Sequence, residues 1–280
     1  MVNHRVYQYT SIARPPDPAE TAMRVILYLL PVAALLGAAL AWRGGGDVPG
    51  VLRGALEFAL ALYGSWALAR ELDPDDTPAA FLGAAVAMLA MILVAAPGLL
   101  IVYVTLGLVR VVNRSSGLPA RRSDAIVLTV LAIGMMYVTD SPLFGLVAAL
   151  AFLLDGSLRE PLRRQWLFGL VCIGAFIVYV VDHDFGLARV GVPDSLFEWL
   201  GLLFVVIFLL DTVLLRRVRA RGEVNNRPLD VNRVRGGMTV GALAALQGLT
   251  EGDRVVLIVA VLAGLCVGIA LRKGFRAPAN

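Results

Sequence analysis

The composition of this 280-residue chain excludes an ordinary soluble domain, because 59% of its residues are hydrophobic and such domains have about 45–50%. The mean hydropathy is +0.78, and a soluble protein of that character would expose large apolar patches. The net charge of +4 rests almost wholly on arginine, which in so apolar a chain indicates membrane topology rather than nucleic-acid binding. We therefore predict an integral membrane protein without a nucleic-acid partner.

Ten apolar stretches are candidates for membrane-spanning helices, since a span needs about 20 mostly apolar residues. Residues 1–22 form a polar tail before them, residues 23–271 form one helical membrane domain, and residues 272–280 form a second tail. The predicted spans are Met23–Trp42, Val51–Ala69, Pro78–Ala95, Gly98–Val112, Asp124–Val138, Pro142–Leu154, Gln165–Val181, Ser195–Leu215, Gly237–Leu249 and Arg254–Leu271. Because helices satisfy the backbone of such segments in lipid, the predicted fold class is an all-α, polytopic transmembrane bundle of eight to ten spans.

Two of these divisions depend on turn signals. As one helix, Pro78–Asn113 would be about 54 Å long, well beyond a hydrocarbon core of about 30 Å. Pro97-Gly98 lies near its middle and is a strong turn signal. The same reasoning divides Asp124–Leu154 at the sequence Thr-Asp-Ser-Pro, residues 139–142.

The distribution of basic residues favours ten spans with both termini in the cytoplasm. In that arrangement 21 of the 25 lysine and arginine residues lie inside, and the outside keeps Arg43, Arg53, Arg189 and Arg254. Arginine and lysine collect in cytoplasmic loops, so this bias supports the arrangement. If Pro78–Asn113 and Asp124–Leu154 were each a single helix, the chain would have eight spans and the basic residues 110–122 would lie outside.

Two short segments resemble each other at the start of predicted spans. Asp76-Thr77-Pro78 precedes one span, and Asp140-Ser141-Pro142 precedes another. The first would lie inside and the second outside, so a true repeat would be inverted, as in many transporters. The alternative is a chance similarity between two helix starts, because proline is favoured in the first turn.

An acidic segment, residues 70–78, stands out in a predicted cytoplasmic connection. Its charged residues are Arg70, Glu71, Asp73, Asp75 and Asp76. Clustered carboxylates suit Mg²⁺ or Ca²⁺, and a metal held there would bind a phosphorylated substrate at the membrane face. The alternative is a helix cap, since acidic residues stabilise the positive N-terminal end of a helix.

Glu57 is the carboxylate that lies well inside a predicted span, and an ionisable group there is a functional candidate. Tyr63 and Ser65 lie deeper on the same segment and would extend a polar path. Arg53, four residues earlier, would instead neutralise Glu57 in a local ion pair. Asp211, near the inner end of a later span, is a weaker candidate for the same path.

The basic residues of Arg216–Arg235 have two interpretations. Together with Asn225 and Asn226 they would hold a nucleotide or lipid phosphates, since basic residues beside a span bind anionic lipid headgroups at about 1 kcal/mol each, or they serve topology alone. The histidine in Asp182-His183-Asp184 lacks the spacing of a metal site. Cys172 and Cys266 lie within apolar segments and are interpreted as buried packing residues.

Ten spans with both termini inside is similar to the drug/metabolite transporter architecture, in count and not in motif. The acidic inner segment is similar to those of membrane prenyltransferases, but the Asn-Asp-x-x-Asp signature of that family is absent. The first hypothesis for function is a small-molecule or ion permease that uses Glu57. The alternatives are an enzyme acting on lipid-linked or phosphorylated substrates with Mg²⁺ at the acidic segment, and a non-catalytic scaffold. The expected location is the prokaryotic cytoplasmic membrane.

Overall fold

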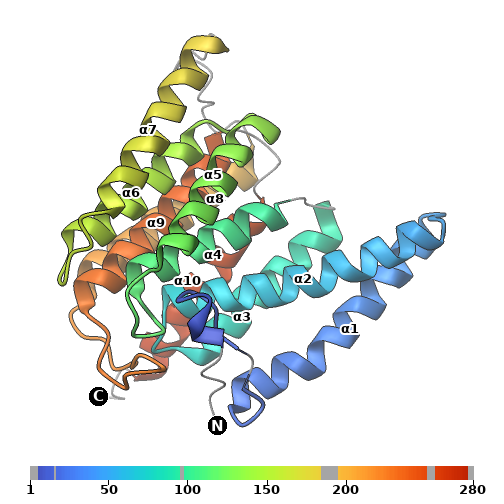
Figure 1. The fold of residues 1–280 in the computed structure, drawn as a ribbon. Helices are drawn as coiled ribbons and strands as arrows, with labels where there is room; N and C mark the ends of the chain where they lie inside the picture. The colour runs from blue at the N-terminus through green and yellow to red at the C-terminus, as the bar shows by residue number, and fades with distance from the viewer. Residues whose placement is uncertain (1–5, 16, 95–97, 184–194, 251–255, 277–280) are drawn as a thin grey trace.

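The computed structural model describes residues 6–15, 17–94, 98–183, 195–250 and 256–276, and its regular elements are helices (Figure 1). A short 3₁₀ helix, η1, spans Val6–Gln8. The α-helices are α1 (Thr21–Arg43), α2 (Val48–Leu72), α3 (Thr77–Val94), α4 (Leu99–Asn113), α5 (Arg122–Val138), α6 (Leu143–Ser157), α7 (Gln165–Asp182), α8 (Leu196–Leu214), α9 (Val231–Thr250) and α10 (Val256–Arg276). Between these elements, the described residues contain an isolated bridge that pairs Arg221 with Pro228 but no strand.

Each of the ten predicted segments corresponds to one helix. The two divided pairs are separate helices, because α3 ends at Val94 before α4 begins at Leu99, and α5 ends at Val138 before α6 begins at Leu143. In the described chain, α1, α7, α8 and α10 are long and apolar enough to cross a membrane. Three further helices, α3, α4 and α6, are also apolar but have shorter described apolar stretches.

The start of α9 differs from the prediction. We expected this span to begin at Gly237, but the helix begins at Val231, so Arg233 and Arg235 are helical rather than part of a loop. The carboxylate of Asp230 accepts hydrogen bonds from the backbone N–H of Asn232 (2.9 Å) and Arg233 (3.1 Å), which caps the helix. Because hydropathy alone assigns charged residues such as these two arginines to loops, it did not predict that the helix begins before them.

The far end of α10 also extends past its predicted limit. The helix continues from Leu271 to Arg276, so Arg272 and Lys273 belong to its last turns rather than to a tail. Basic residues near a helix C-terminus are favoured by the negative end of the helix dipole.

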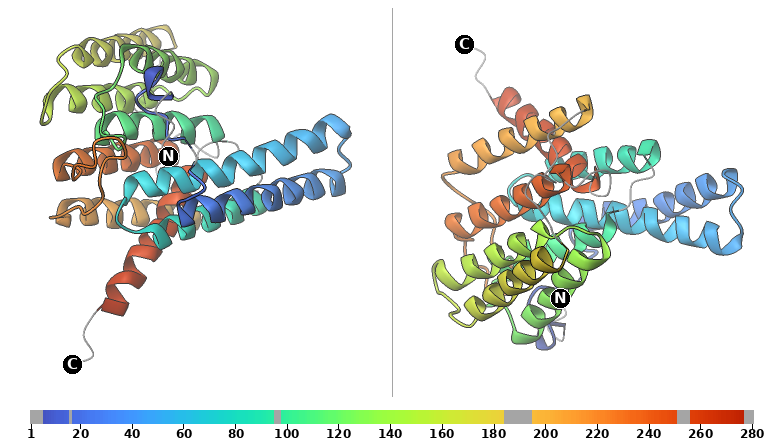
Figure 2. Two further views of the ribbon diagram at one scale, coloured as in Figure 1. Left: turned by 60° about the horizontal axis from the view of Figure 1, so that its bottom comes forward. Right: turned by 90° about the horizontal axis from the view of Figure 1, so that it is seen from above.

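Of the four long apolar helices, α1, α7 and α8 have few buried residues and lie at the edge of the bundle, whereas α10 is about half buried. α1 packs mainly on α2, and the two form an antiparallel hairpin that projects from the other helices (Figures 1 and 2). By contrast, the 15-residue α4 is buried along most of its length and contacts α2, α5, α6 and α9. A helix surrounded by protein need not match the thickness of a bilayer, so its short length does not argue against a membrane bundle.

The connections after α2, α4, α6 and α8 gather at one end of the bundle, together with the N-terminal segment and the end of α10. We call this region the polar layer. Its links between connections include Ser11 with Asp124, Asp75 with the backbone of Arg219, Glu223 with the backbone of Ser115, Arg164 with the carbonyl of Ala120, and Asp73 with Arg272. These contacts join segments that are far apart in sequence.

The two similar segments at Asp76 and Asp140 do not share a local structure. The carboxylate of Asp76 accepts a hydrogen bond from the backbone N–H of Ala79 (3.1 Å) and caps α3. Asp140 has a left-handed backbone, with φ of 51°, and accepts a hydrogen bond from the Tyr179 hydroxyl (3.2 Å). The resemblance therefore does not extend to what the two side chains do.

Candidate functional site: an arginine-lined pocket

Two charged residues at the start of the acidic segment are engaged within the protein. Glu71 is buried, with its Oε1 3.0 Å from Arg110 Nε and 3.9 Å from Arg14 Nη1. Arg70 forms an ion pair with Glu20, and its guanidinium lies 5.3 Å from the centre of the Trp66 ring. Burial lowers the pKa of Arg14, while the Glu71 carboxylate opposes that shift.

The aspartates of the segment are also engaged. Arg272 lies between Asp73 and Asp76, at 3.2 Å and 3.1 Å from their carboxylate oxygens. Burial raises the pKa of Asp73 to about 6, although the Arg272 guanidinium pulls it down. Asp75 accepts hydrogen bonds from the backbone N–H groups of Arg219 and Ala220, at 2.8–3.0 Å.

This arrangement does not fit the Mg²⁺ site that the acidic segment suggested. Within the described residues, no three histidine, cysteine or acidic side chains form a group that could hold a metal ion. The aspartate oxygens face a guanidinium and backbone N–H donors, which occupy the positions that a cation would need. The helix-cap interpretation holds for Asp76, which caps α3, whereas Asp75 binds the backbone of the α8–α9 loop.

The candidates for a transport path are not brought together. Glu57 is 39% exposed on the projecting hairpin, and its Oε1 accepts a hydrogen bond from Arg53 Nε at 2.7 Å. Ser65 is fully buried farther along α2, and Tyr63 packs against the Trp66 ring at 6.2 Å between centroids. Asp211 lies at the other end of the bundle, paired with Lys273 of α10.

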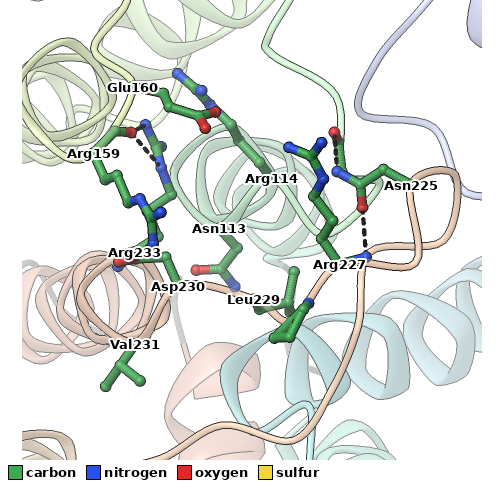
Figure 3. A pocket seen from close by; sticks show the side chains of 12 residues that line it. Asn113, Arg114, Arg159, Glu160, Asn225, Arg227, Leu229, Asp230, Val231 and Arg233 are labelled. Carbon is green, nitrogen blue, oxygen red and sulfur yellow. Dashed lines mark hydrogen bonds and ion pairs between the residues drawn. The ribbon is translucent and has the colours of Figure 1, made fainter.

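A pocket of about 450 Å³ opens in the polar layer (Figure 3). It lies between the end of α4, the α6–α7 connection, the α8–α9 loop and the first turn of α9. We call it the arginine pocket. Its charged lining residues are Arg114, Arg159, Arg227, Arg233, Glu160 and Asp230. A pocket of this size is within the range of small-molecule sites.

Two of these arginines are fixed in the wall by one buried carboxylate. Asp155 of α6 is fully buried, and its Oδ1 accepts hydrogen bonds from Arg114 Nε (2.9 Å) and Arg233 Nη1 (2.8 Å). Arg233 also donates to the carbonyl of Val112 at the end of α4 (2.9 Å). One carboxylate faces two guanidinium groups, so this part of the wall carries a net positive charge.

At the rim of the pocket, some charged side chains have no hydrogen bond or ion pair with the described residues. In the described part of the chain, the side chains of Arg227 and Glu160 form no hydrogen bond or ion pair, and Arg159 approaches Asp230 at 3.8 Å. The loop beneath Arg227 is nevertheless held in place: Asn225 donates to the carbonyl of Gly117 (2.8 Å) and accepts from the backbone N–H of Arg227 (3.0 Å). The rim therefore presents two cations, Arg159 and Arg227, and two carboxylates, Glu160 and Asp230, and Arg159 and Asp230 form an ion pair.

Unusual backbone conformations also gather at this pocket. Four non-glycine residues among those described have a positive φ, and Arg114 (50°) and Glu160 (56°) line the pocket. A third, Asn226 (50°), lies between the lining residues Asn225 and Arg227. Such conformations cost on the order of 1–3 kcal/mol each and concentrate at functional sites.

The sequence predicts part of this pocket, since residues 216–235 are a candidate site for lipid phosphates or a nucleotide, but it does not predict which other segments meet them. Sequence reasoning assigned Arg233 to a loop and treated Arg114 and Arg159 as topology signals. The signal that was present is the recurrence of arginine at the inner ends of three predicted spans, but hydropathy does not show which ends meet. Glu160 lies in a predicted inner connection of mixed charge, residues 155–160, which was a candidate to converge with the acidic segment rather than with these arginines.

Comparison with protein-family models, with curated proteins and with solved structures finds no match to this chain. The function is therefore argued from the geometry of the pocket.

Proposed function

We propose that the chain is a membrane protein of ten spans, with both ends in the cytoplasm, that binds a phosphate-bearing anion in the arginine pocket. Three features support the topology. Alternate connections meet in the polar layer, the basic residues concentrate there, and the short helices α4 and α6 are largely enclosed by protein. The polar layer would then lie at the inner surface of a prokaryotic cytoplasmic membrane.

The binding function is inferred from the combination of buried and free arginines around one cavity. Arg114 and Arg233 supply a fixed positive wall. Within the described chain, Arg227 is unpaired at the rim, and the exposed side chain of Arg159 is held only by a long ion pair with Asp230 (3.8 Å). Guanidinium groups match phosphate geometry through paired N–H donors. The inner membrane surface is also where lipid phosphates and phosphorylated metabolites are both accessible.

This proposal replaces the permease hypothesis based on Glu57. That carboxylate is paired with Arg53 on an exposed part of α2, away from the polar layer. It also sets aside an enzyme that uses Mg²⁺ at the acidic segment, because those carboxylates already bind Arg272 and backbone N–H groups. Binding of anionic lipid headgroups, predicted for Arg216–Arg235, becomes one case of the proposed function.

A cysteine-protection experiment tests both the topology and the site. Val231 lines the pocket without a polar contact, and the native Cys172 and Cys266 are buried, so Val231→Cys provides the reactive probe. A membrane-impermeant maleimide should label this variant in inverted membrane vesicles and not in intact cells. Inorganic phosphate at millimolar concentration should slow the labelling, whereas chloride of equal ionic strength should not.

A pair of matched substitutions serves as the control. Arg227→Gln in the Val231→Cys background should abolish the protection by phosphate. Arg122→Gln, which removes an exposed arginine of α5 outside the pocket, should leave it intact. Labelling from outside the cell would overturn the topology, and labelling that phosphate does not slow would overturn the binding site.

A further inference from the structure

The rim of the arginine pocket is not uniformly basic. Glu160 carries a carboxylate without a partner among the described residues, in the same lining as the free guanidinium of Arg227 (Figure 3). Its left-handed backbone, with φ of 56°, sets its position in the α6–α7 connection. A site selected for bare phosphate would gain nothing from a negative charge on its rim, since like charges oppose binding.

From this arrangement, and resting on the proposed function, we infer that the ligand is a phosphate ester that also carries a hydroxyl or amine close to the phosphate. Arg159 and Arg227 hold the phosphate against the positive wall, and Glu160 accepts a hydrogen bond from the second group. Glycerol phosphate, whether free or as a lipid headgroup, is the simplest molecule of this class.

The position of the pocket fits either source of such a ligand. The α6–α7 connection leads into α7, which lies at the edge of the bundle (Figure 1). In the first turn of this helix Trp166 and Leu167 are exposed. Trp166 donates a hydrogen bond from its indole N–H to the carbonyl of Gly156 (3.1 Å), which holds it beside the polar layer. Exposed tryptophan at the end of an apolar helix is typical of the membrane interface. A headgroup has access from that side, and a soluble ester has access from the cytoplasm.

The inference predicts a selectivity that depends on Glu160. Purified protein in detergent should bind glycerol 3-phosphate about tenfold more tightly than inorganic phosphate, measured by calorimetry, because a hydrogen bond to a charged group contributes about a factor of ten. Glu160→Gln should remove this preference and should also tighten the binding of inorganic phosphate, because a repelling charge is lost. A merely structural role for Glu160 would weaken both ligands together.

Glu57→Gln provides the matched control, since it removes the same charge far from the pocket and should leave both affinities unchanged. Protection of Val231→Cys then distinguishes the sources. Slower labelling in nanodiscs of phosphatidylglycerol than of phosphatidylcholine identifies a headgroup, and protection by glycerol 3-phosphate alone identifies a soluble ester. If inorganic phosphate binds as well as glycerol 3-phosphate, this inference fails while the proposed function stands. If neither binds, the proposed function fails as well.

Discussion

The acidic segment and the arginine pocket are both charged parts of the polar layer, but they differ in how many of their charged side chains are paired within the protein. In the acidic segment the carboxylates of Asp73 and Asp76 share Arg272, and Asp75 binds backbone N–H groups. In the arginine pocket Asp155 holds Arg114 and Arg233 in the wall, while the side chains of Arg227 and Glu160 at the rim form no hydrogen bond or ion pair in the described chain. The first cluster joins segments of the protein, and the second retains capacity for a ligand. Density of charge in the sequence is therefore a poor guide to a binding site.

The largest expected effect on stability comes from Asp155, which holds the wall of the arginine pocket together. Asp155→Asn should destabilise the protein by about 3–5 kcal/mol, because it leaves the guanidinium groups of Arg114 and Arg233 buried without a counter-charge. Unfolding of the protein in mixed micelles by increasing SDS measures this loss. Asp75→Asn, whose hydrogen bonds are exposed, is the control and should cost about 1–2 kcal/mol. Equal losses for the two variants would contradict the distinction between a buried wall and an exposed link.

Asp73 offers an intermediate effect that depends on pH. Its pKa in the folded protein is about 6, above the ordinary value of 3.8, because burial penalises the charged carboxylate. The stability it contributes is fully present below pH 3.8 and is lost as the pH rises through 6. The loss is on the order of 2–3 kcal/mol, since one pKa unit corresponds to about 1.4 kcal/mol.

The variant Asp73→Asn isolates that effect. Its stability should fall less than that of the wild type between pH 4.5 and pH 7.5, measured by thermal unfolding in detergent. Asp17→Asn, at a partly exposed position in the N-terminal segment, should keep the wild-type pH dependence. A pH profile unchanged by Asp73→Asn would mean that Arg272 outweighs the burial of this carboxylate.

Glu57 should give the smallest effect. Glu57→Gln removes one side of an exposed ion pair within a helix, and such pairs contribute little to stability. We expect no measurable change in the SDS unfolding midpoint and no change in protection of Val231→Cys by phosphate. A loss of phosphate protection in this variant would connect the projecting hairpin to the pocket and reopen the permease hypothesis.

The positions of the helices follow from local features of the sequence. Ten apolar segments, two turn signals and the charge bias predicted ten separate helices, and the structure has them, with limits that differ mainly at the start of α9 and the end of α10. Hydrophobic length and proline-glycine turns act locally, so they can be read from neighbouring residues. The helix-cap interpretation of Asp76 succeeded for the same reason, since a cap involves residues three positions apart.

Tertiary structure alone decided which charges meet. Arg114, Asp155 and Arg233 are far apart in sequence and belong to three different helix ends, and their hydrogen bonds form only when α4, α6 and α9 pack together. The same packing places Arg272 of α10 against the acidic segment. The carboxylates of that segment therefore bind a guanidinium group instead of a metal ion. Whether a charged side chain is satisfied depends on partners that the packing of distant helices supplies. The arginine pocket could therefore be located only after those partners were known.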